Sequence, residues 1–193
     1  MKKTLLFCVL ALVSPMVLAN NVETTVQKNL SQASIKNLSQ NHKIAFRANK
    51  GDVEKFYENF YAENPTMSFV WIAQDGITPQ AKELIEILQK SNYKGLFPKN
   101  YHVDQLQQLQ AETLNDENQQ LFDLLMTDAA LSYLRDISVG QPELISVEQK
   151  SWLLPRDKFN SVVVLQQLLK APDASVVIES IEPKHDQYHL LLD

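Results

Sequence analysis

Apolar residues recur at intervals of three and four over most of this chain, which is the spacing of helices with one buried face. The clearest case spans residues 78–95, where the apolar face is made by Ala81, Leu84, Ile85 and Leu88. Thr78 is a good N-cap, Pro79 suits the first helical position, and Gly95 closes the segment. We therefore predict a helix that begins at this Thr-Pro pair.

Similar spacing predicts helices on both sides of that segment. Asp116 opens the longest one, because Gln119 follows it at the distance of a capping box, and Gly140 stops it. Its broad apolar stripe consists of Leu121, Leu124, Leu125, Ala129, Leu131 and Leu134. Further helices are expected over residues 51–64, 103–112, 157–170 and 174–182.

Extended structure has little support in the pattern. Phe69 to Ile72 form one short extended run, with Trp71 as the expected core anchor, and no longer segment alternates between apolar and polar residues. The glycines separate the periodic segments, at Gly51, Gly76, Gly95 and Gly140. We predict an all-α fold, a single domain of antiparallel helices with short connections.

The first residues follow a different pattern. Two lysines precede an apolar run, and Val17-Leu18-Ala19 matches a small-residue cleavage site. The run is shorter than the roughly 20 residues that a membrane span needs. We therefore predict a signal peptide over residues 1–19 and an exported, periplasmic mature protein. Residues 20–43 are rich in Asn, Gln and Ser and are expected to form a flexible polar leader, followed by the helical domain over residues 44–193.

Composition narrows the possible functions. Cys8 is the only cysteine and lies in the predicted signal peptide, so the mature chain has no disulfide, thiolate metal site or cysteine nucleophile. Signal cleavage also removes Lys2 and Lys3, which leaves 16 basic against 23 acidic residues and a formal charge of −7. Such a chain is a poor candidate for binding nucleic acid, and the mature part has no apolar stretch long enough to cross a membrane.

Few residues suggest chemistry. His185 and His189 are spaced for one face of a helix and could hold a metal, but a site needs a third ligand, and two exposed histidines are the commoner explanation. Asp128 falls inside the apolar stripe and could be a tuned acid or base. A carboxylate in such a place more often accepts hydrogen bonds from the backbone, or pairs with a basic side chain such as Arg135.

Several aromatic residues could line a sugar-binding groove, although aromatic packing in the core is the commoner arrangement. They are Trp71, Trp152, Tyr57, Tyr61, Tyr101 and Tyr133. On this basis we predict no catalytic, cofactor-binding or metal site, and no cofactor.

Three short motifs follow one another along the chain. They are a Gly-Leu-x-Pro-x-x-Tyr turn (Gly95, Leu96, Pro98, Tyr101), a Thr-x-Ala helix that closes at a glycine (Thr127, Ala129, Gly140) and a Pro-x-His-x-x-Tyr cap (Pro183, His185, Tyr188). In this order they resemble the amino-terminal scaffold domain of the large exported L,D-transpeptidases, bacterial enzymes that make alternative peptidoglycan crosslinks. The resemblance covers about residues 53–193.

The resemblance implies a non-catalytic periplasmic scaffold domain in cell-wall biogenesis, truncated or stand-alone, with peptidoglycan or a cell-wall enzyme as a possible partner. The family's catalytic domain carries a Ser-His-Gly-Cys-x-Arg motif that is absent here, so no catalytic residue can be carried over. Two alternatives stay open: one half of a split L,D-transpeptidase with a separately encoded catalytic chain, and an unrelated exported helical binding module. The terminal helix from Lys184 is expected to be frayed.

Overall fold

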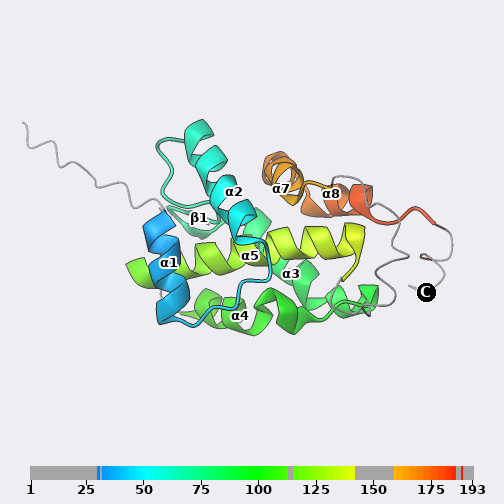
Figure 1. The fold of residues 1–193 in the computed structure, drawn as a ribbon, viewed down its shortest axis with the longest axis horizontal. Coiled ribbons are helices and arrows are strands. Elements are labelled where there is room, and N and C mark those ends of the chain that lie inside the picture. Colours follow the sequence, from blue (N-terminus) through cyan, green and yellow to red (C-terminus); the bar gives the residue numbers. More distant parts are fainter. Residues whose placement is uncertain (1–29, 31, 113–114, 142–158, 186–187, 189–193) are drawn as a thin grey trace, which may run out of the picture.

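The structure is a computed structural model that describes residues 30, 32–112, 115–141, 159–185 and 188. Within them, seven α-helices and one small hairpin make an all-α domain, which confirms the predicted fold class (Figure 1). The helices are α1 (Gln32–Asn41), α2 (Lys50–Glu63), α3 (Pro79–Gln89), α4 (Val103–Ala111), α5 (Asp116–Val139), α7 (Ser161–Lys170) and α8 (Ala174–Ile181). Two 3₁₀ turns, Ser91–Lys94 and Pro98–Tyr101, connect α3 to α4.

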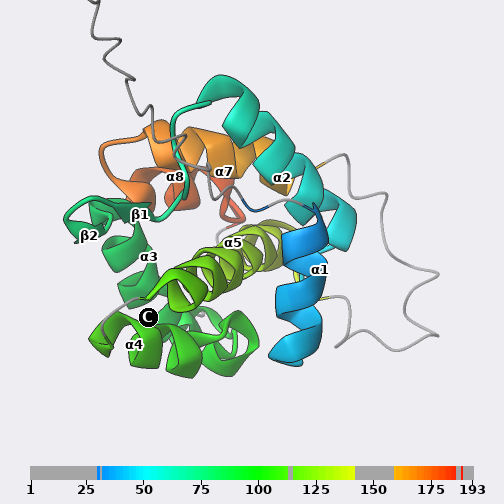
Figure 2. The ribbon, with the colours of Figure 1, turned by 90° about the vertical axis from the view of Figure 1, so that its left-hand side faces the viewer.

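Helix α5 lies at the centre of the domain and contacts each of the other six helices (Figure 2). Every residue from Phe122 to Leu134 is buried. A helix that is buried on all sides is the interior element of its domain, whereas the sequence pattern predicted one broad apolar stripe. The bounds of α5 agree with the prediction, but its N-cap is Asn115, whose Oδ1 accepts a hydrogen bond from Asn118 N at 2.8 Å.

Helix α3 begins where its sequence predicts. Thr78 Oγ1 accepts a hydrogen bond from Ala81 N at 3.2 Å, and Pro79 occupies the first turn. The helix itself ends at Gln89, and the 3₁₀ turn that follows closes at Gly95, whose φ of 71° lies in the left-handed region. All four residues of the predicted apolar face are buried, namely Ala81, Leu84, Ile85 and Leu88.

The expected flexible leader over residues 20–43 is wrong for residues 32–41, which form α1. Ile35 is 1% exposed and Leu38 is 6% exposed, and both belong to the main apolar core. The apolar face of α1 is sparse, so its sequence alone gave little sign of a helix; contact with α5 supplies the missing burial. The predicted signal peptide and residues 20–29 lie outside the described residues.

A small hairpin with strands of two residues each lies between α2 and α3. Strands β1 (Ile72–Ala73) and β2 (Gly76–Ile77) pair antiparallel, with Ile72 opposite Ile77. The expected extended run from Phe69 therefore contributes only its last residue to a strand, whereas Trp71 is fully buried, as predicted. Gly51 does not separate elements as expected, because it lies in the first turn of α2.

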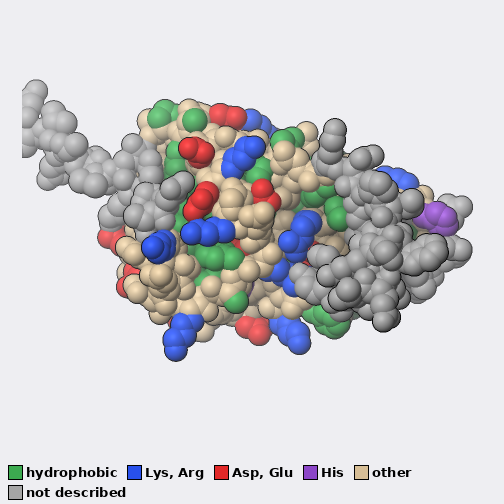
Figure 3. Space-filling model, in the orientation of Figure 1, with side chains coloured by type: hydrophobic (Ala, Val, Ile, Leu, Met, Phe, Trp, Pro, Cys, Tyr) green, Lys and Arg blue, Asp and Glu red, His purple; other side chains and the backbone are tan. Residues whose placement is uncertain are grey.

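The described surface is mixed in character. Side chains of both charges are interspersed over the face drawn in Figure 3, with apolar side chains in small groups between them. Among the described helices, none has the length and apolar content needed to cross a membrane.

Candidate functional site

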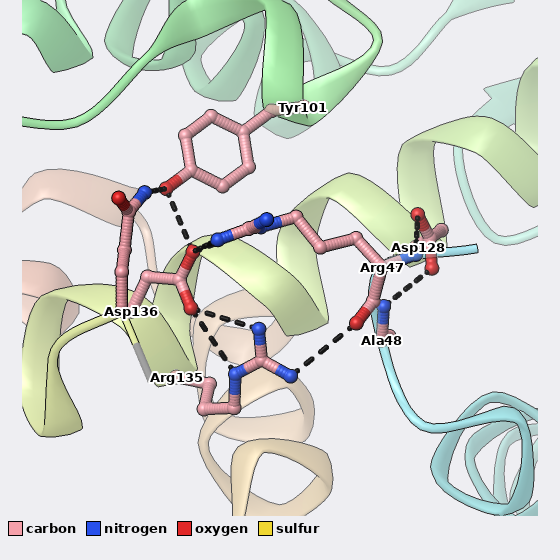
Figure 4. A network of polar contacts seen from close by, with 7 residues as sticks. Arg47, Ala48, Tyr101, Asp128, Arg135 and Asp136 are labelled. Atoms are coloured by element: carbon pink, nitrogen blue, oxygen red, sulfur yellow. Dashed lines mark hydrogen bonds and ion pairs between the residues drawn. The ribbon is translucent and has the colours of Figure 1, made fainter. Parts of the chain in front are cut away.

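Asp128 of α5, the only carboxylate that the sequence marked for possible chemistry, is completely buried. Its Oδ1 accepts a hydrogen bond from Ala48 N at 2.9 Å, and its Oδ2 accepts one from Arg47 N at 3.2 Å (Figure 4). His102 Nε2 lies 2.8 Å from the same Oδ2. The expectation of backbone donors is confirmed, but the basic partner is His102 rather than Arg135.

Arg135 instead pairs with Asp136, one residue further along α5. Asp136 Oδ1 accepts hydrogen bonds from Arg135 Nε and Nη2 at 3.1 and 2.9 Å. Its Oδ2 accepts from Arg47 Nε and Nη2 at 3.0 and 2.8 Å, and from the Tyr101 hydroxyl at 3.0 Å (Figure 4). A carboxylate buried at 2% exposure is thus compensated by two guanidinium groups, which is what a buried charge requires.

A third buried carboxylate, Asp123, holds the segment that leads into the hairpin. Its Oδ1 accepts hydrogen bonds from Val70 N and Trp71 N, both at 2.8 Å, and its Oδ2 accepts one from the Tyr57 hydroxyl at 2.9 Å. Burial raises the pKa of Asp123 to about 7, because the cost of desolvating the charge exceeds the benefit of these hydrogen bonds.

Thr127 extends the Asp123 network by one helical turn. Its Oγ1 accepts a hydrogen bond from Trp71 Nε1 at 2.9 Å and lies 3.0 Å from the Tyr57 hydroxyl. The side chain of Trp71 is therefore oriented by the same helix that holds its backbone. A pKa near 7 is typical of acid–base residues, but Asp123 has no exposed surface and its oxygens are bonded to this chain.

The aromatic residues that could have lined a sugar groove are mostly core residues. Trp71, Tyr57, Tyr101 and Tyr133 are all buried, and Tyr61 is partly buried with its hydroxyl donating to Ser68 O at 2.9 Å. Trp152 lies outside the described residues. Among the described residues, these aromatic side chains therefore pack in the core, as the commoner arrangement predicted.

The histidine pair gains no third ligand in the described part of the chain. His185 is exposed, and His189 lies outside the described residues. Among the described residues, no group of three or more His, Cys, Asp or Glu side chains is placed to hold a metal ion.

The residues of the three motifs that carry the resemblance form turns, helix ends and core contacts in the described structure. Gly95 adopts a left-handed conformation, and Tyr101 is buried with its hydroxyl bonded to Asp136. Thr127 bonds to α2 and to Trp71, and Gly140 ends α5. In the last motif, Tyr188 N donates to His185 O at 2.9 Å, while much of the expected terminal helix lies outside the described residues.

Sequence reasoning missed Asp123, Asp136 and Arg47. The two aspartates carried a usable signal, because each lies within the mostly apolar stretch of the predicted long helix, and a buried acid needs several hydrogen-bond donors. Arg47 gave no such signal, because it lies outside the helices and its contact with Asp136 of α5 is visible only in the folded structure.

The chain is thus an all-α domain built around one buried helix, α5. Aspartates of this helix form hydrogen bonds with segments that are distant in the sequence. A family model described as a scaffold domain matches residues 55–193, and the chain belongs to that family. No curated protein and no solved structure matches the chain.

Proposed function

We propose that this chain is a non-catalytic, exported scaffold domain of the L,D-transpeptidase type, which positions a cell-wall protein or glycan in the periplasm. The scaffold-family match supports the scaffold role. The order of the three sequence motifs, from Gly95 to Tyr188, supports the affiliation with L,D-transpeptidases.

One observation carries the non-catalytic role: the buried acids of α5 have their carboxylate oxygens bonded to groups of the domain itself. Asp123, Asp128 and Asp136 are each 2% exposed or less, and their partners come from segments up to 89 residues away in the sequence. A catalytic acid or base must reach the proton that it transfers. These acids hold the fold together instead.

The first experiment uses the chain from Asn20 and purified peptidoglycan sacculi. We expect the protein to sediment with the sacculi, or to bind a separately produced L,D-transpeptidase catalytic domain, and to form no new crosslinks by itself. Mass spectrometry of digested sacculi measures the crosslinks. Crosslinking by the chain alone would overturn the non-catalytic role.

The same experiment separates the alternatives. Crosslinks that form only when this chain and the catalytic domain are both present, and with neither alone, would favour one half of a split enzyme. Binding to neither sacculi nor catalytic domain would overturn the cell-wall role and leave an unrelated helical binding module. Serum albumin, another acidic protein, serves as the control for nonspecific sedimentation.

A further inference from the structure

A groove of about 530 Å³ lies where the segment before α2 meets the turn before α4. It is lined by residues 43–47 on one side and by Lys99, Asn100, His102 and Gln105 on the other. Two lysines, one arginine and one histidine line it, and no acidic residue does. This composition is unusual for a chain with a formal charge of −5.

The four basic side chains of the groove are not equivalent. Arg47 is paired with Asp136, and His102 is bonded to Asp128, so buried carboxylates offset these two groups. Lys43 and Lys99 are exposed, and neither has an ion pair with another described residue. Lys99 Nζ lies 5.8 Å from the centre of the Phe97 ring, which leaves its charge unneutralised. The two lysines therefore give the groove its net positive charge.

Asp128 holds both walls of the groove. It accepts hydrogen bonds from Arg47 N on one wall and from Ala48 N next to that wall, and it contacts His102 Nε2 on the other wall. Because a single buried carboxylate joins the two walls, their separation is set by the fold before any ligand binds. The backbone of a site built in this way loses little conformational entropy on binding.

The backbone of both walls is also unusual. Lys43 and His102 have φ values of 49° and 54°, and they are the non-glycine residues with positive φ in the part of the chain that the structure describes. Such conformations are uncommon for residues with a Cβ and cluster at ligand sites. Here they occur on opposite sides of the same basic groove.

We propose that this groove binds a small organic anion, with its carboxylate or phosphate oxygens between Lys43 and Lys99. The apolar part of the ligand would lie against Ile44 and Phe46, which are half-buried in the same wall. Lysine ammonium groups suit either kind of anionic oxygen. This site is independent of the role in the cell wall proposed above.

The test is an NMR titration of the ¹⁵N-labelled chain from Asn20 with inorganic phosphate, acetate and butyrate, at constant ionic strength set with sodium chloride. We expect saturable shifts in the amides of residues 43–47 and 99–105 with at least one probe. Saturation by phosphate alone assigns a phosphate ligand. Saturation by the carboxylates, with butyrate tighter than acetate, assigns a carboxylate with an apolar tail.

Two double variants with the same loss of charge complete the test. Lys43→Gln with Lys99→Gln should weaken binding about tenfold, since each lysine contributes a charge-assisted contact. Lys36→Gln with Lys55→Gln removes two exposed lysines elsewhere and should change binding less than about twofold. Equal effects of the two double variants, or no saturable shift with any probe, would overturn the proposal. Neither variant alters Asp128 or its partners, so both should keep the fold, which the unchanged amide spectrum of α5 would verify.

Discussion

The hydroxyl groups of Tyr101 and Tyr133 differ in their partners although their rings pack together. The ring centres are 5.5 Å apart at an angle of 88°, and both side chains are fully buried. Burial raises the pKa of both phenols. The Tyr101 hydroxyl donates to Asp136 at 3.0 Å, whereas the Tyr133 hydroxyl has no hydrogen-bond partner among the described residues. Both rings therefore share the same packing, but among the described residues only the Tyr101 hydroxyl makes hydrogen bonds.

Replacing each tyrosine by phenylalanine isolates that difference. Tyr101→Phe should lower the free energy of unfolding by about 1.5–3 kcal/mol, because it removes a hydrogen bond to a charged group. Tyr133→Phe should be neutral or stabilising, because it removes a buried polar atom without a bond. Urea unfolding measures both variants, and equal destabilisation would contradict the assignment of partners.

Asp123 predicts a specific dependence of stability on pH. Its pKa is raised in the folded state from an ordinary value of 3.8 to about 7. The folded state therefore binds the proton more tightly, so the contribution of Asp123 to stability is complete below about pH 4 and is lost as the pH rises through 7. The loss is up to about 1.4 kcal/mol per pH unit in this window.

Asp123→Asn should remove this dependence, because its amide oxygen still accepts from Val70 N and Trp71 N but the side chain does not ionise. Relative to the unmodified chain, we expect Asp123→Asn to become progressively more stable between pH 4.5 and pH 8. Asp75→Asn, at the exposed turn of the hairpin, is the control. Parallel stability curves for the unmodified chain and Asp123→Asn would show that Asp123 does not titrate in this range.

At the scale of the elements, carboxylates on helices hold the segments that lie between other helices. Asp128 holds residues 47–48 before α2, and Asp123 holds residues 70–71 before the hairpin. Glu83 of α3 acts similarly on α8, because it accepts hydrogen bonds from Ala174 N at 3.0 Å and Ser175 N at 3.2 Å. Each contact satisfies backbone N–H groups that would otherwise be buried without partners or left free at a helix start.

Removing these carboxylates one at a time should loosen different segments. In Asp128→Ala, amide exchange should accelerate over residues 42–48, because two backbone donors lose their acceptor. In Asp123→Ala, it should accelerate over residues 68–73 instead. Hydrogen exchange followed by mass spectrometry checks both, with α7 as the internal reference. If either variant accelerated exchange in both segments, the carboxylates would stabilise the whole domain rather than their own partner segments.

The elements predictable from sequence were those whose signals are local. Thr78, Pro79 and the apolar face of α3 specify a helix without tertiary help, and Gly140 marks the end of α5 in the same way. Helix α1 was not predictable, because its few apolar residues become useful only against α5. Asp128 could be singled out because it is an acidic residue in an apolar stripe. Its partners Arg47 and His102 could not be predicted, because they lie 81 and 26 residues away in the sequence and no helical periodicity links them to Asp128.

At the scale of the whole molecule, the folded unit extends beyond the family match. The match begins at residue 55, yet α1 packs into the same core and Arg47 completes the buried charges of α5. Asp128 and Asp136 would lose donors without residues 44–48. Residues before the family match therefore contribute to the stability of the domain.

A variant that begins at Lys50 tests this extension. Compared with the chain from Asn20, it should lose more than about 3 kcal/mol of unfolding free energy, because removal of Arg47 leaves a buried carboxylate with a reduced set of partners. Guanidinium chloride unfolding measures the loss. The same midpoint and slope for both chains would show that the domain is complete without these residues.

The backbone donors of Asp123 and Asp128 also set which substitutions their partner segments can accept. Every amino acid except proline supplies an N–H group. Ala48 and Val70 are therefore limited by side-chain volume, since both are buried, but not by any required functional group. Trp71 is limited further, because its Nε1 donates a hydrogen bond to Thr127 Oγ1. Across natural or selected variants, we expect size-conserving replacements such as Ala48→Ser to be accepted at Ala48 and Val70. Ala48→Pro should be rejected as strongly as loss of the aspartate.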